Sequence, residues 1–406
     1  MSDAGLRPAR VNPAVTAMAR SGIRDIMDAA WGRPEIIRLE VGEPDFPTPA
    51  HIVEAAHVAA VEGHTGYMPS AGIPQLREAL AIKVAERNGY AVAPDQTIVT
   101  QGGVEAIYAS LLTLTRPGDE ILLPDPAWPN FLMMAHLLNL TPVTYPLTPE
   151  SGFVPTVEAL EQLVSKRTSV IVVNSPSNPL GSVIDGARMT QLLEFTERHG
   201  LWMLSDECYD EITFDDAFVS PASIAAERVV SVYSFSKTYA MTGWRIGYAV
   251  APATVAPSIA KCQEPLISCV NTPTQHAALA AVTGPQAPVR AMRDAYRERR
   301  DLALGVLSGS PLPAFTPRGA FYLWVDIRSL GLPSREVALR LLEERLVAVA
   351  PGSAFGERGE GFLRVSLASA AAALTEGMRR LVDFAASVGP ANSSRPAPAS
   401  DAVRLR

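Results

Sequence analysis

One lysine beside two serines is the group in this sequence best suited to covalent chemistry. Ser234, Ser236 and Lys237 follow a strand-like run of valine and aromatic residues that begins near Val229, and Arg245 comes shortly after them. An amine can attack a carbonyl carbon, while hydroxyls and a guanidinium can bind a phosphate. The stretch therefore predicts a phosphate cradle beside an amine nucleophile, although a lysine or arginine taken alone is usually a solvated surface charge.

The same residues permit a second interpretation. Ser234 to Lys237 match S-x-x-K, the serine-nucleophile motif of penicillin-recognising enzymes, which also carry S-D-N and K-T-G. Neither of these tripeptides occurs in the chain. A serine hydrolase is therefore the weaker alternative.

Five strand-like segments end in polar or aromatic residues, and we expect these ends to meet. Helical patterns lie between several of the segments, which predicts an α/β domain with a largely parallel sheet. In such a sheet, ligands bind at the carboxyl ends of the strands. The segments are 97–100, 120–123, 169–174, 201–204 and 229–233, and they deliver Gly102, Gly103, Trp128, Asn178, Asp206, Tyr209, Ser234, Ser236 and Lys237 to that edge.

The residue types at this edge fit one class of ligand. Paired glycines before a helix bind an anion, Trp128 offers a face to a flat ring, and Asp206 and Tyr209 offer partners for polar ring atoms. A phosphorylated pyridine aldehyde fits all of these and the Lys237 amine, whereas no G-x-G-x-x-G supports a nicotinamide cofactor. Taken singly, Trp128 fits a core residue, Asp206 a helix cap and Asn178 a turn, so only their combination predicts a site.

The rest of the chain predicts a stiff loop and a second, smaller domain. Prolines forbid regular structure in the loop 42–49, and a long charged helix at 287–307 leads to strands and helices of a smaller α+β unit. We expect four regions: an arm and part of the small domain at 1–47, a large domain at 48–290, a small domain at 291–389, and a disordered tail at 390–406.

Composition narrows the class of protein. With 406 residues, 48% of them hydrophobic and 19% charged, the chain has room for two globular domains, and its net charge of -7 argues against nucleic-acid binding. Three cysteines without C-x-x-C predict neither a disulfide framework nor a metal site, and favour a reducing, cytoplasmic location. No signal peptide or membrane-spanning apolar run is present, so we expect no membrane partner.

Taken together, the motifs resemble those of the class I aminotransferases, which are pyridoxal-phosphate enzymes of the aspartate aminotransferase fold (fold type I). The resemblance covers about residues 20 to 385 and implies a mostly parallel sheet sandwiched by helices, with a smaller α+β domain. It rests on S-F-S-K-T-Y-A-M-T-G-W-R-I-G-Y, S-P-S-N-P-L-G, D-E-C-Y, V-G-E-P-D-F, Q-G-G-V-E-A-I and F-L-R-V-S.

The resemblance implies a role for each site residue. Lys237 would form the Schiff base with pyridoxal 5'-phosphate and shuttle the substrate proton. The ring would be held by Asp206 at its nitrogen, by Tyr209 and Asn178 at its hydroxyl, and by Trp128 at its face. The phosphate would be held by Ser234, Ser236, Arg245, the backbone at Gly103 and Val104, and Tyr67 of a neighbouring subunit, which implies a homodimer with shared sites. The substrate's α-carboxylate would be bound by Arg364, Asn178 and the Gly42 backbone.

One departure from the family pattern concerns the amino donor. In the aspartate-specific bacterial branch a lysine follows the two glycines, whereas this chain has Val104, with Ile23 expected near the substrate side chain. A neutral side chain cannot pair with a second carboxylate, so we predict a neutral or aromatic amino donor; Arg24 could replace the charge, although it fits a surface residue better. A β-eliminating C–S lyase on the same fold is the alternative to amino-group transfer.

Overall fold

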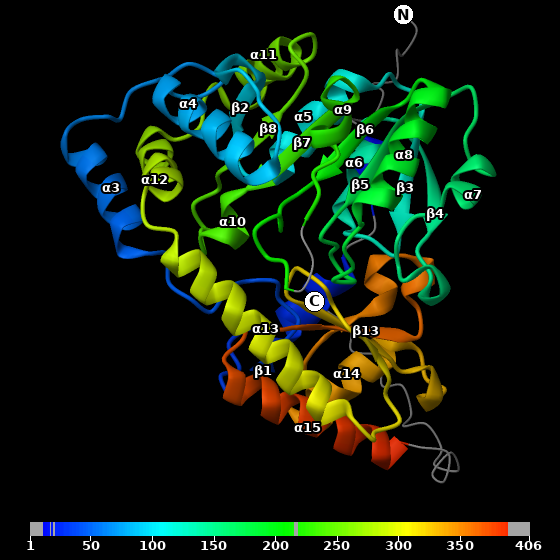
Figure 1. Cartoon of the computed structure of the whole chain (residues 1–406). Coiled ribbons are helices and arrows are strands. Elements are labelled where there is room, and N and C mark those ends of the chain that lie inside the picture. Colours follow the sequence, from blue (N-terminus) through cyan, green and yellow to red (C-terminus); the bar gives the residue numbers. More distant parts are fainter. Residues whose placement is uncertain (1–10, 17, 19–20, 215–217, 389–406) are drawn as a thin grey trace, which may run out of the picture.

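Two sheets of unequal size organise the fold, as the computed structural model of the chain shows (Figure 1). The structure describes residues 11–16, 18, 21–214 and 218–388; the start of the predicted arm and the tail predicted at 390–406 lie outside these ranges. One sheet has seven strands and the other has four, with a two-stranded pair beside the smaller sheet.

The large sheet brings the predicted strand ends to one edge. Its order is β2 (Thr97–Thr100), β8 (Gly247–Val250), β7 (Val229–Ser234), β6 (Trp202–Asp206), β5 (Thr168–Asn174), β3 (Glu120–Asp125) and β4 (Thr141–Pro146). Strand β8 runs antiparallel to both of its neighbours, and the other six strands run in the same direction. The residues that follow those six strands and the residues that precede β8 therefore lie at the same edge.

Both faces of the large sheet are buried, as expected for parallel strands. In β5, Ile171 and Val173 face one apolar core, and Val170 and Val172 face the other. The helices that supply residues to the first core are α3 (Ala50–Val61), α4 (Pro74–Lys83), α7 (Val157–Glu161), α8 (Gly186–His199), α9 (Ala222–Ala225), α10 (Phe235–Thr238), α12 (Thr272–Thr283) and the start of α13 (Ala287–Leu307). Those that supply residues to the second are α5 (Gly103–Leu114), α6 (Asn130–Leu137) and α11 (Ala256–Ile267).

The smaller sheet has its own core and is reached through one long helix. Its strands are β12 (Ala350–Pro351), β13 (Phe362–Ser366), β10 (Tyr322–Asp326) and β9 (Ala314–Phe315), and β1 (Ile37–Arg38) pairs with β11 (Val347–Ala348) beside them. The helices are α2 (Gly22–Ala30), α14 (Ser334–Arg345) and α15 (Ala371–Val388), together with α13 (Ala287–Leu307), which descends diagonally from the large sheet in Figure 1. The short helix α1 (Pro13–Thr16) contacts α6 beside the large sheet.

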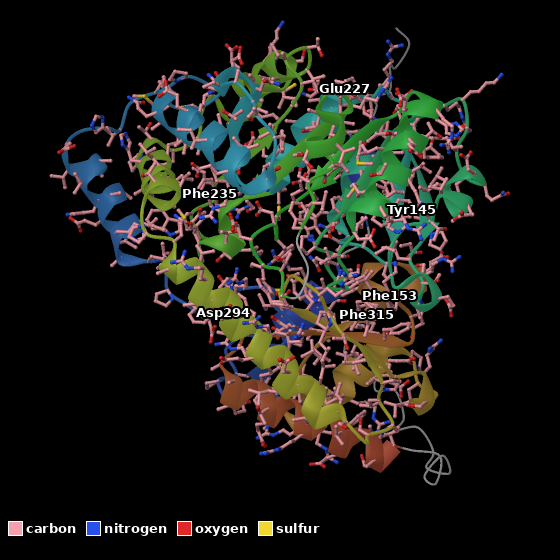
Figure 2. The ribbon with its side chains drawn as sticks, viewed as in Figure 1. Tyr145, Phe153, Glu227, Phe235, Asp294 and Phe315 are labelled. Carbon is pink, nitrogen blue, oxygen red and sulfur yellow. The ribbon has the colours of Figure 1, made fainter. Side chains whose placement is uncertain are left out.

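Contacts join the two parts of the molecule. The ring of Phe153, from the large part, packs edge-on against Phe315 of β9 with ring centroids 5.1 Å apart, and Figure 2 labels both side chains at this junction. We propose that the domain boundary lies near the start of α13, as the division at residues 290 and 291 predicts. Within the described ranges, no helix combines the length and the apolar character needed to cross a bilayer.

Several predicted elements differ from the structure at their ends. The sequence of residues 74–88 predicts one continuous helix, but the chain changes to a π-helix at Val84–Asn88. Residues 244–250 predict one strand, but β8 begins only at Gly247, because Arg245 has a positive φ of 54°. The edge strand β4 was not predicted, because its sequence, TPVTYP, begins and ends near prolines, which strands tolerate chiefly at sheet edges.

Candidate active site

A cavity of about 550 Å³ lies at the carboxyl edge of the large sheet and extends to the smaller sheet. Its walls include all but two of the residues singled out from the sequence. These are Ile23, Gly42, Gly103, Val104, Trp128, Asn178, Asp206, Tyr209, Ser234, Ser236, Lys237, Arg245 and Arg364. The exceptions are Gly102, directly before α5, and Tyr67, which is 86% exposed; both lie outside this cavity wall.

Lys237 lies on the short helix α10 (Phe235–Thr238), directly after β7. Its Nζ donates a hydrogen bond to the carbonyl of Gly42 at 2.5 Å, and so joins the predicted stiff loop to the sheet edge. A side chain at position 42 would collide with the Tyr322 hydroxyl, so the loop can approach only with glycine there. Burial lowers the pKa of Lys237 to about 8, against the opposing influence of Cys208 and Glu43.

This lowered pKa predicts how the reactivity of Lys237 depends on pH. The neutral amine predominates above about pH 8 and the ammonium below it, so acetylation of Lys237 should rise about tenfold per pH unit up to about pH 8 and then level off. Peptide mass spectrometry of the cofactor-free protein after brief acetylation between pH 6 and 10 measures this dependence. A midpoint above pH 10 would contradict the effect of burial on this amine.

Asp206 is a buried carboxylate that lacks a cationic partner within the described part of the chain. It ends β6, its side chain lines the cavity, and its Oδ1 accepts a hydrogen bond from the Cys208 N–H at 3.2 Å. Burial raises the pKa of Asp206, and the hydrogen bonds from Cys208 oppose that rise. A cation placed in the cavity would favour the charged carboxylate.

Tyr209 lies at the same edge and contacts the smaller sheet. Its hydroxyl is 2.8 Å from the hydroxyl of Tyr322 on β10, and both rings are buried. Burial, followed by the neighbouring Tyr322, raises the pKa of Tyr209, so its hydroxyl stays protonated at neutral pH. It can therefore donate a hydrogen bond to a group in the cavity.

A cradle for an anion lies beside the lysine. Helix α5 begins at Gly103, so its free N–H groups and positive end point at the cavity. Gly102 has a φ of 79°, and a side chain there would lie 2.6 Å from a guanidinium nitrogen of Arg245. Ser234 and Ser236 line the same cavity, with the Ser234 hydroxyl accepting a hydrogen bond from the Ser236 N–H at 3.2 Å.

Arg364 is a buried cation that forms no ion pair within the described residues. One of its terminal nitrogens donates to Asn178 Oδ1 at 3.0 Å and the other to the Glu40 carbonyl at 2.5 Å. Its Nε is buried without a hydrogen-bond partner. The guanidinium lies over the ring of Tyr322, 4.3 Å from its centroid. A carboxylate is the group that a buried guanidinium of this kind binds best.

Some residues of the cavity wall could not be identified from the sequence. Tyr322 is the clearest, because its role depends on the smaller sheet packing against the larger one, which no local pattern reveals. The others are Ser21, Met27, Glu40, Val41, Ile107, Pro129, Asn130, Cys208 and Thr242.

The donor set fits a phosphorylated pyridine aldehyde. It combines a cradle for an anion, a buried carboxylate for a ring nitrogen, a phenol for a ring hydroxyl, and an amine with a lowered pKa. The S-x-x-K hydrolase has no support in the geometry, because Lys237 bonds to the Gly42 carbonyl and Ser234 bonds to the backbone of α10.

Comparison with known proteins gives concordant matches over most of the chain. A family model described as aminotransferase class I and II matches residues 34–381. The aspartate aminotransferase of Pyrococcus horikoshii is 37% identical over 371 residues, 90% of this chain and 95% of that protein. Aromatic-amino-acid aminotransferase 2 of Thermococcus litoralis is 38% identical, over 89% of this chain and 94% of that protein.

A solved structure gives the same result for the fold. Aspartate aminotransferase from Thermus thermophilus, solved with maleate, superposes with a TM-score of 0.89 at 36% identity, over 93% of this chain and 100% of that one. The predicted α/β architecture with a smaller α+β part is therefore confirmed.

Proposed function

This chain belongs to the class I and II aminotransferases, and from that membership we propose that the cavity around Lys237 is its active site. The protein moves an amino group from an amino acid to a 2-oxo acid and uses pyridoxal 5'-phosphate as its cofactor. The lyase alternative has no support among the relatives described above, each of which is named an aminotransferase.

The observation that carries this proposal is a pair of buried, unpaired, opposite charges on the wall of one cavity. Asp206 lacks a cation and Arg364 lacks an anion within the described part of the chain. Both line the cavity with the Lys237 amine. Leaving either charge buried and alone is costly, so each is expected to meet its counterion in a bound molecule. A cationic pyridine ring and an amino-acid carboxylate supply the two missing charges.

We assign the remaining residues by the groups they can hold. Trp128 would lie against the ring, Tyr209 and Asn178 would bond its hydroxyl, and the α5 N-terminus at Gly103 and Val104 would bind the phosphate with Ser234, Ser236 and Arg245. When bound, the cofactor supplies a ring that accepts the electrons left on the substrate α-carbon. Lys237 would take the α-proton and return it to the cofactor carbon, and its low pKa makes the neutral amine accessible near neutral pH.

A product analysis tests amino-group transfer. With one amino acid and one 2-oxo acid supplied, the protein should form the new 2-oxo acid and the new amino acid in equal amounts. Release of ammonia or a thiol in place of the second amino acid would contradict transfer and favour the lyase.

We propose that the donor is a neutral or aromatic amino acid. The cavity wall includes the apolar side chains of Ile23, Ile107 and Val104. Arg24 also contributes to the wall, from an exposed position on α2. The Thermococcus litoralis relative is named as an aromatic-amino-acid enzyme, and the Pyrococcus horikoshii relative as an aspartate enzyme.

Replacing Val104 by lysine is expected to change the donor preference. In the unmodified enzyme, kcat/KM for leucine or phenylalanine should exceed that for aspartate. V104K should raise kcat/KM for aspartate about tenfold or more, because a hydrogen-bonded charge pair contributes about 1.5–3 kcal/mol. Steady-state kinetics with all three donors measures the change.

Val104→Met is the matched control, because it lengthens the side chain without adding charge. It should not raise kcat/KM for aspartate. An unmodified enzyme that uses aspartate far better than alanine, leucine and phenylalanine would overturn the proposed donor class. In that case R24Q would show whether Arg24 supplies the missing charge.

We also propose a homodimer with shared active sites. Tyr67 is 86% exposed and lies outside the cavity wall of its own chain, so it is free to reach the phosphate of a second copy. Helix α3 nearby in sequence exposes Val53, Val58 and Val61, apolar side chains that a partner would cover. Sedimentation of the purified protein at the mass of one chain would contradict the dimer.

The free state of all three cysteines supports our proposal of a cytoplasmic location.

A further inference from the structure

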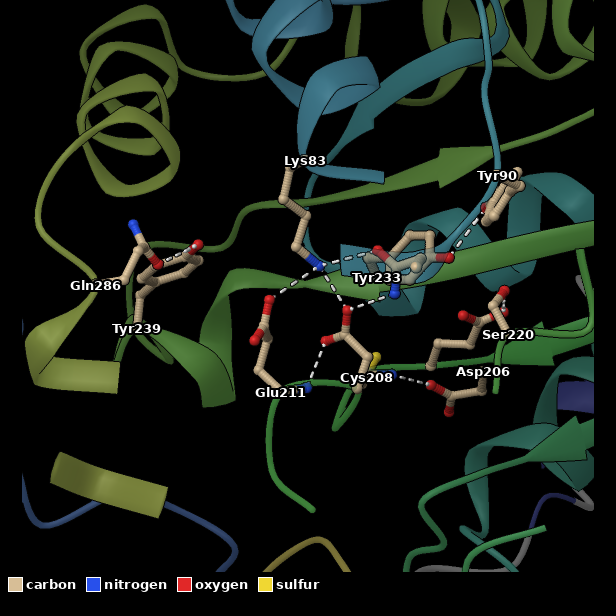
Figure 3. A network of polar contacts seen from close by, with 12 residues as sticks. Lys83, Tyr90, Asp206, Cys208, Glu211, Ser220, Tyr233, Tyr239 and Gln286 are labelled. Atoms are coloured by element: carbon tan, nitrogen blue, oxygen red, sulfur yellow. Dashed lines mark hydrogen bonds and ion pairs between the residues drawn. The ribbon is translucent and has the colours of Figure 1, made fainter. Parts of the chain in front are cut away.

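A buried charged cluster lies behind the candidate site and contacts the turn that carries two of its residues. Lys83 Nζ is 2.5 Å from Asp210 Oδ2, and their side chains are only 10% and 5% exposed. Asn88 Nδ2 donates to the same Asp210 oxygen at 3.0 Å, and Lys83 Nζ donates to Asn88 Oδ1 at 3.3 Å. Figure 3 shows Lys83 reaching down from its helix towards the turn that holds Cys208 and Glu211.

The π-helix explains how one helix end supplies two partners to one carboxylate. Lys83 ends α4, and Asn88 ends the π-helix that continues it. In an α-helix with about 3.6 residues per turn, residues five apart point about 140° away from each other. A turn closed by i→i+5 hydrogen bonds brings such residues to nearly the same face. The irregular helix end therefore directs both side chains at Asp210.

The turn that receives these contacts carries candidate cofactor ligands. Asp206 ends β6 and Tyr209 directly precedes Asp210. Within the turn, the backbone bonds are Asp210 N–H to Glu207 at 3.0 Å and Ile212 N–H to Tyr209 at 2.8 Å. These bonds close the turn on itself, whereas the bonds to Lys83 and Asn88 attach it to a separate helix.

Lys83 also contacts the second segment of the site. Its Nζ lies 5.1 Å from the centroid of the Tyr233 ring, and Tyr233 directly precedes Ser234. Lys83 is absent from the wall of the candidate site, so it does not touch a ligand there. A buried ion pair commonly gives no more stability than an apolar pair of the same size, so stability alone does not account for this one.

We propose that Lys83 and Asn88 are positioning residues that act through Asp210 to fix the turn bearing Asp206 and Tyr209 against the cofactor ring. The proposal rests on the proposed function of the cavity. The proposal requires that substitutions in the cluster change the affinity for the cofactor and the spectrum of the bound cofactor, in addition to any change in the stability of the protein.

The test compares two variants with a matched control. Lys83→Met together with Asp210→Leu replaces the closest ion pair by apolar side chains and also removes the cation that lies 3.7 Å from the Glu211 carboxylate. Asn88→Ala removes only the hydrogen bonds of Asn88 and leaves the Lys83–Asp210 ion pair in place. The control is Glu120→Gln, which replaces a buried carboxylate by a neutral amide and so breaks its ion pair with Arg167. Glu120 lies on the same sheet but at the amino-terminal end of β3, at the edge opposite the candidate site. The readouts are the Kd of the cofactor-free protein for pyridoxal phosphate, the absorbance spectrum of the bound cofactor against pH, and Tm.

We expect the double variant to raise Kd about tenfold or more, to shift the pH midpoint of the bound-cofactor spectrum, and to lower kcat by about 10- to 100-fold, since small displacements of reacting groups have effects of this size. N88A should raise Kd about threefold. E120Q should lower Tm and leave both Kd and the spectrum unchanged.

The role is overturned if the double variant and N88A, or N88A alone where the double variant does not fold, keep Kd and the spectral midpoint within twofold of the unmodified protein. The cluster would then be structural only. Failure of the unmodified protein to bind pyridoxal phosphate at all would instead refute the proposed function.

Discussion

Replacing Lys237 by alanine is expected to lower the rate of amino-group transfer by about 10⁴-fold or more. Lys237 is the only amine among the residues that line the cavity in the described part of the chain, and it would provide both the covalent bond to the cofactor and the group that moves the substrate proton. Removal of a residue that acts as nucleophile and base has effects of this order. Steady-state turnover with a good donor and 2-oxo acid measures the loss.

The matched control is Lys261→Ala, which removes an exposed lysine on α11, away from the cavity wall. It should keep full activity. Pyridoxal phosphate should still bind to K237A through the phosphate cradle and Asp206, but without a covalent bond. Activity of K237A within tenfold of the unmodified enzyme would show that another group performs the chemistry.

The second large effect is expected from Asp206→Asn, which lowers kcat/KM by about 10² to 10³-fold. Asp206 is 5% exposed and has no cationic partner among the described residues, so its charge is directed at whatever occupies the cavity. An amide of the same shape carries no charge and cannot hold a proton on the ring nitrogen. Electrostatic groups that act on charge developing during the reaction have contributions of this size.

Asp185→Asn controls for the loss of a carboxylate elsewhere. Asp185 caps helix α8 by accepting a hydrogen bond from the Arg188 N–H at 2.8 Å, and it is exposed. This control should change stability slightly and activity not at all. If D206N retained more than a third of the activity, Asp206 would not be the partner of the ring nitrogen.

The sequence alone was sufficient to locate most of the candidate site, for a physical reason. Parallel strands with both faces buried read as short apolar runs, so their ends are visible, and the residues after them must share one edge. Asp206, Ser234 and Lys237 were found in this way. Arg245 lies there too, because β8 runs in the opposite direction and begins where the others end.

Other parts of the site depend on contacts that have no local signature. Tyr322 reaches Tyr209 only because the smaller sheet packs over the larger one. Lys83 meets Asp210 across a long stretch of chain, and the π-helix that allows this looks like an ordinary helix in sequence. For the same reason, a helix expected to run unbroken to Asn88 was wrong in its last turn.

Two side chains of the cavity wall bear on the donor class of the proposed function. The neutral side chain of Val104 favours a neutral or aromatic donor, whereas the positive charge of Arg24, which also lines the cavity, favours aspartate. The comparison of V104K with V104M and R24Q therefore separates two chemical explanations for the same pocket.

The most direct measurement of the central proposal is reduction of the cofactor-loaded protein with borohydride, followed by peptide mass spectrometry. One pyridoxyl group per chain should be found on Lys237 and should be absent from K237A. A colourless protein that borohydride leaves unlabelled, or a label found on another lysine, would contradict the proposal.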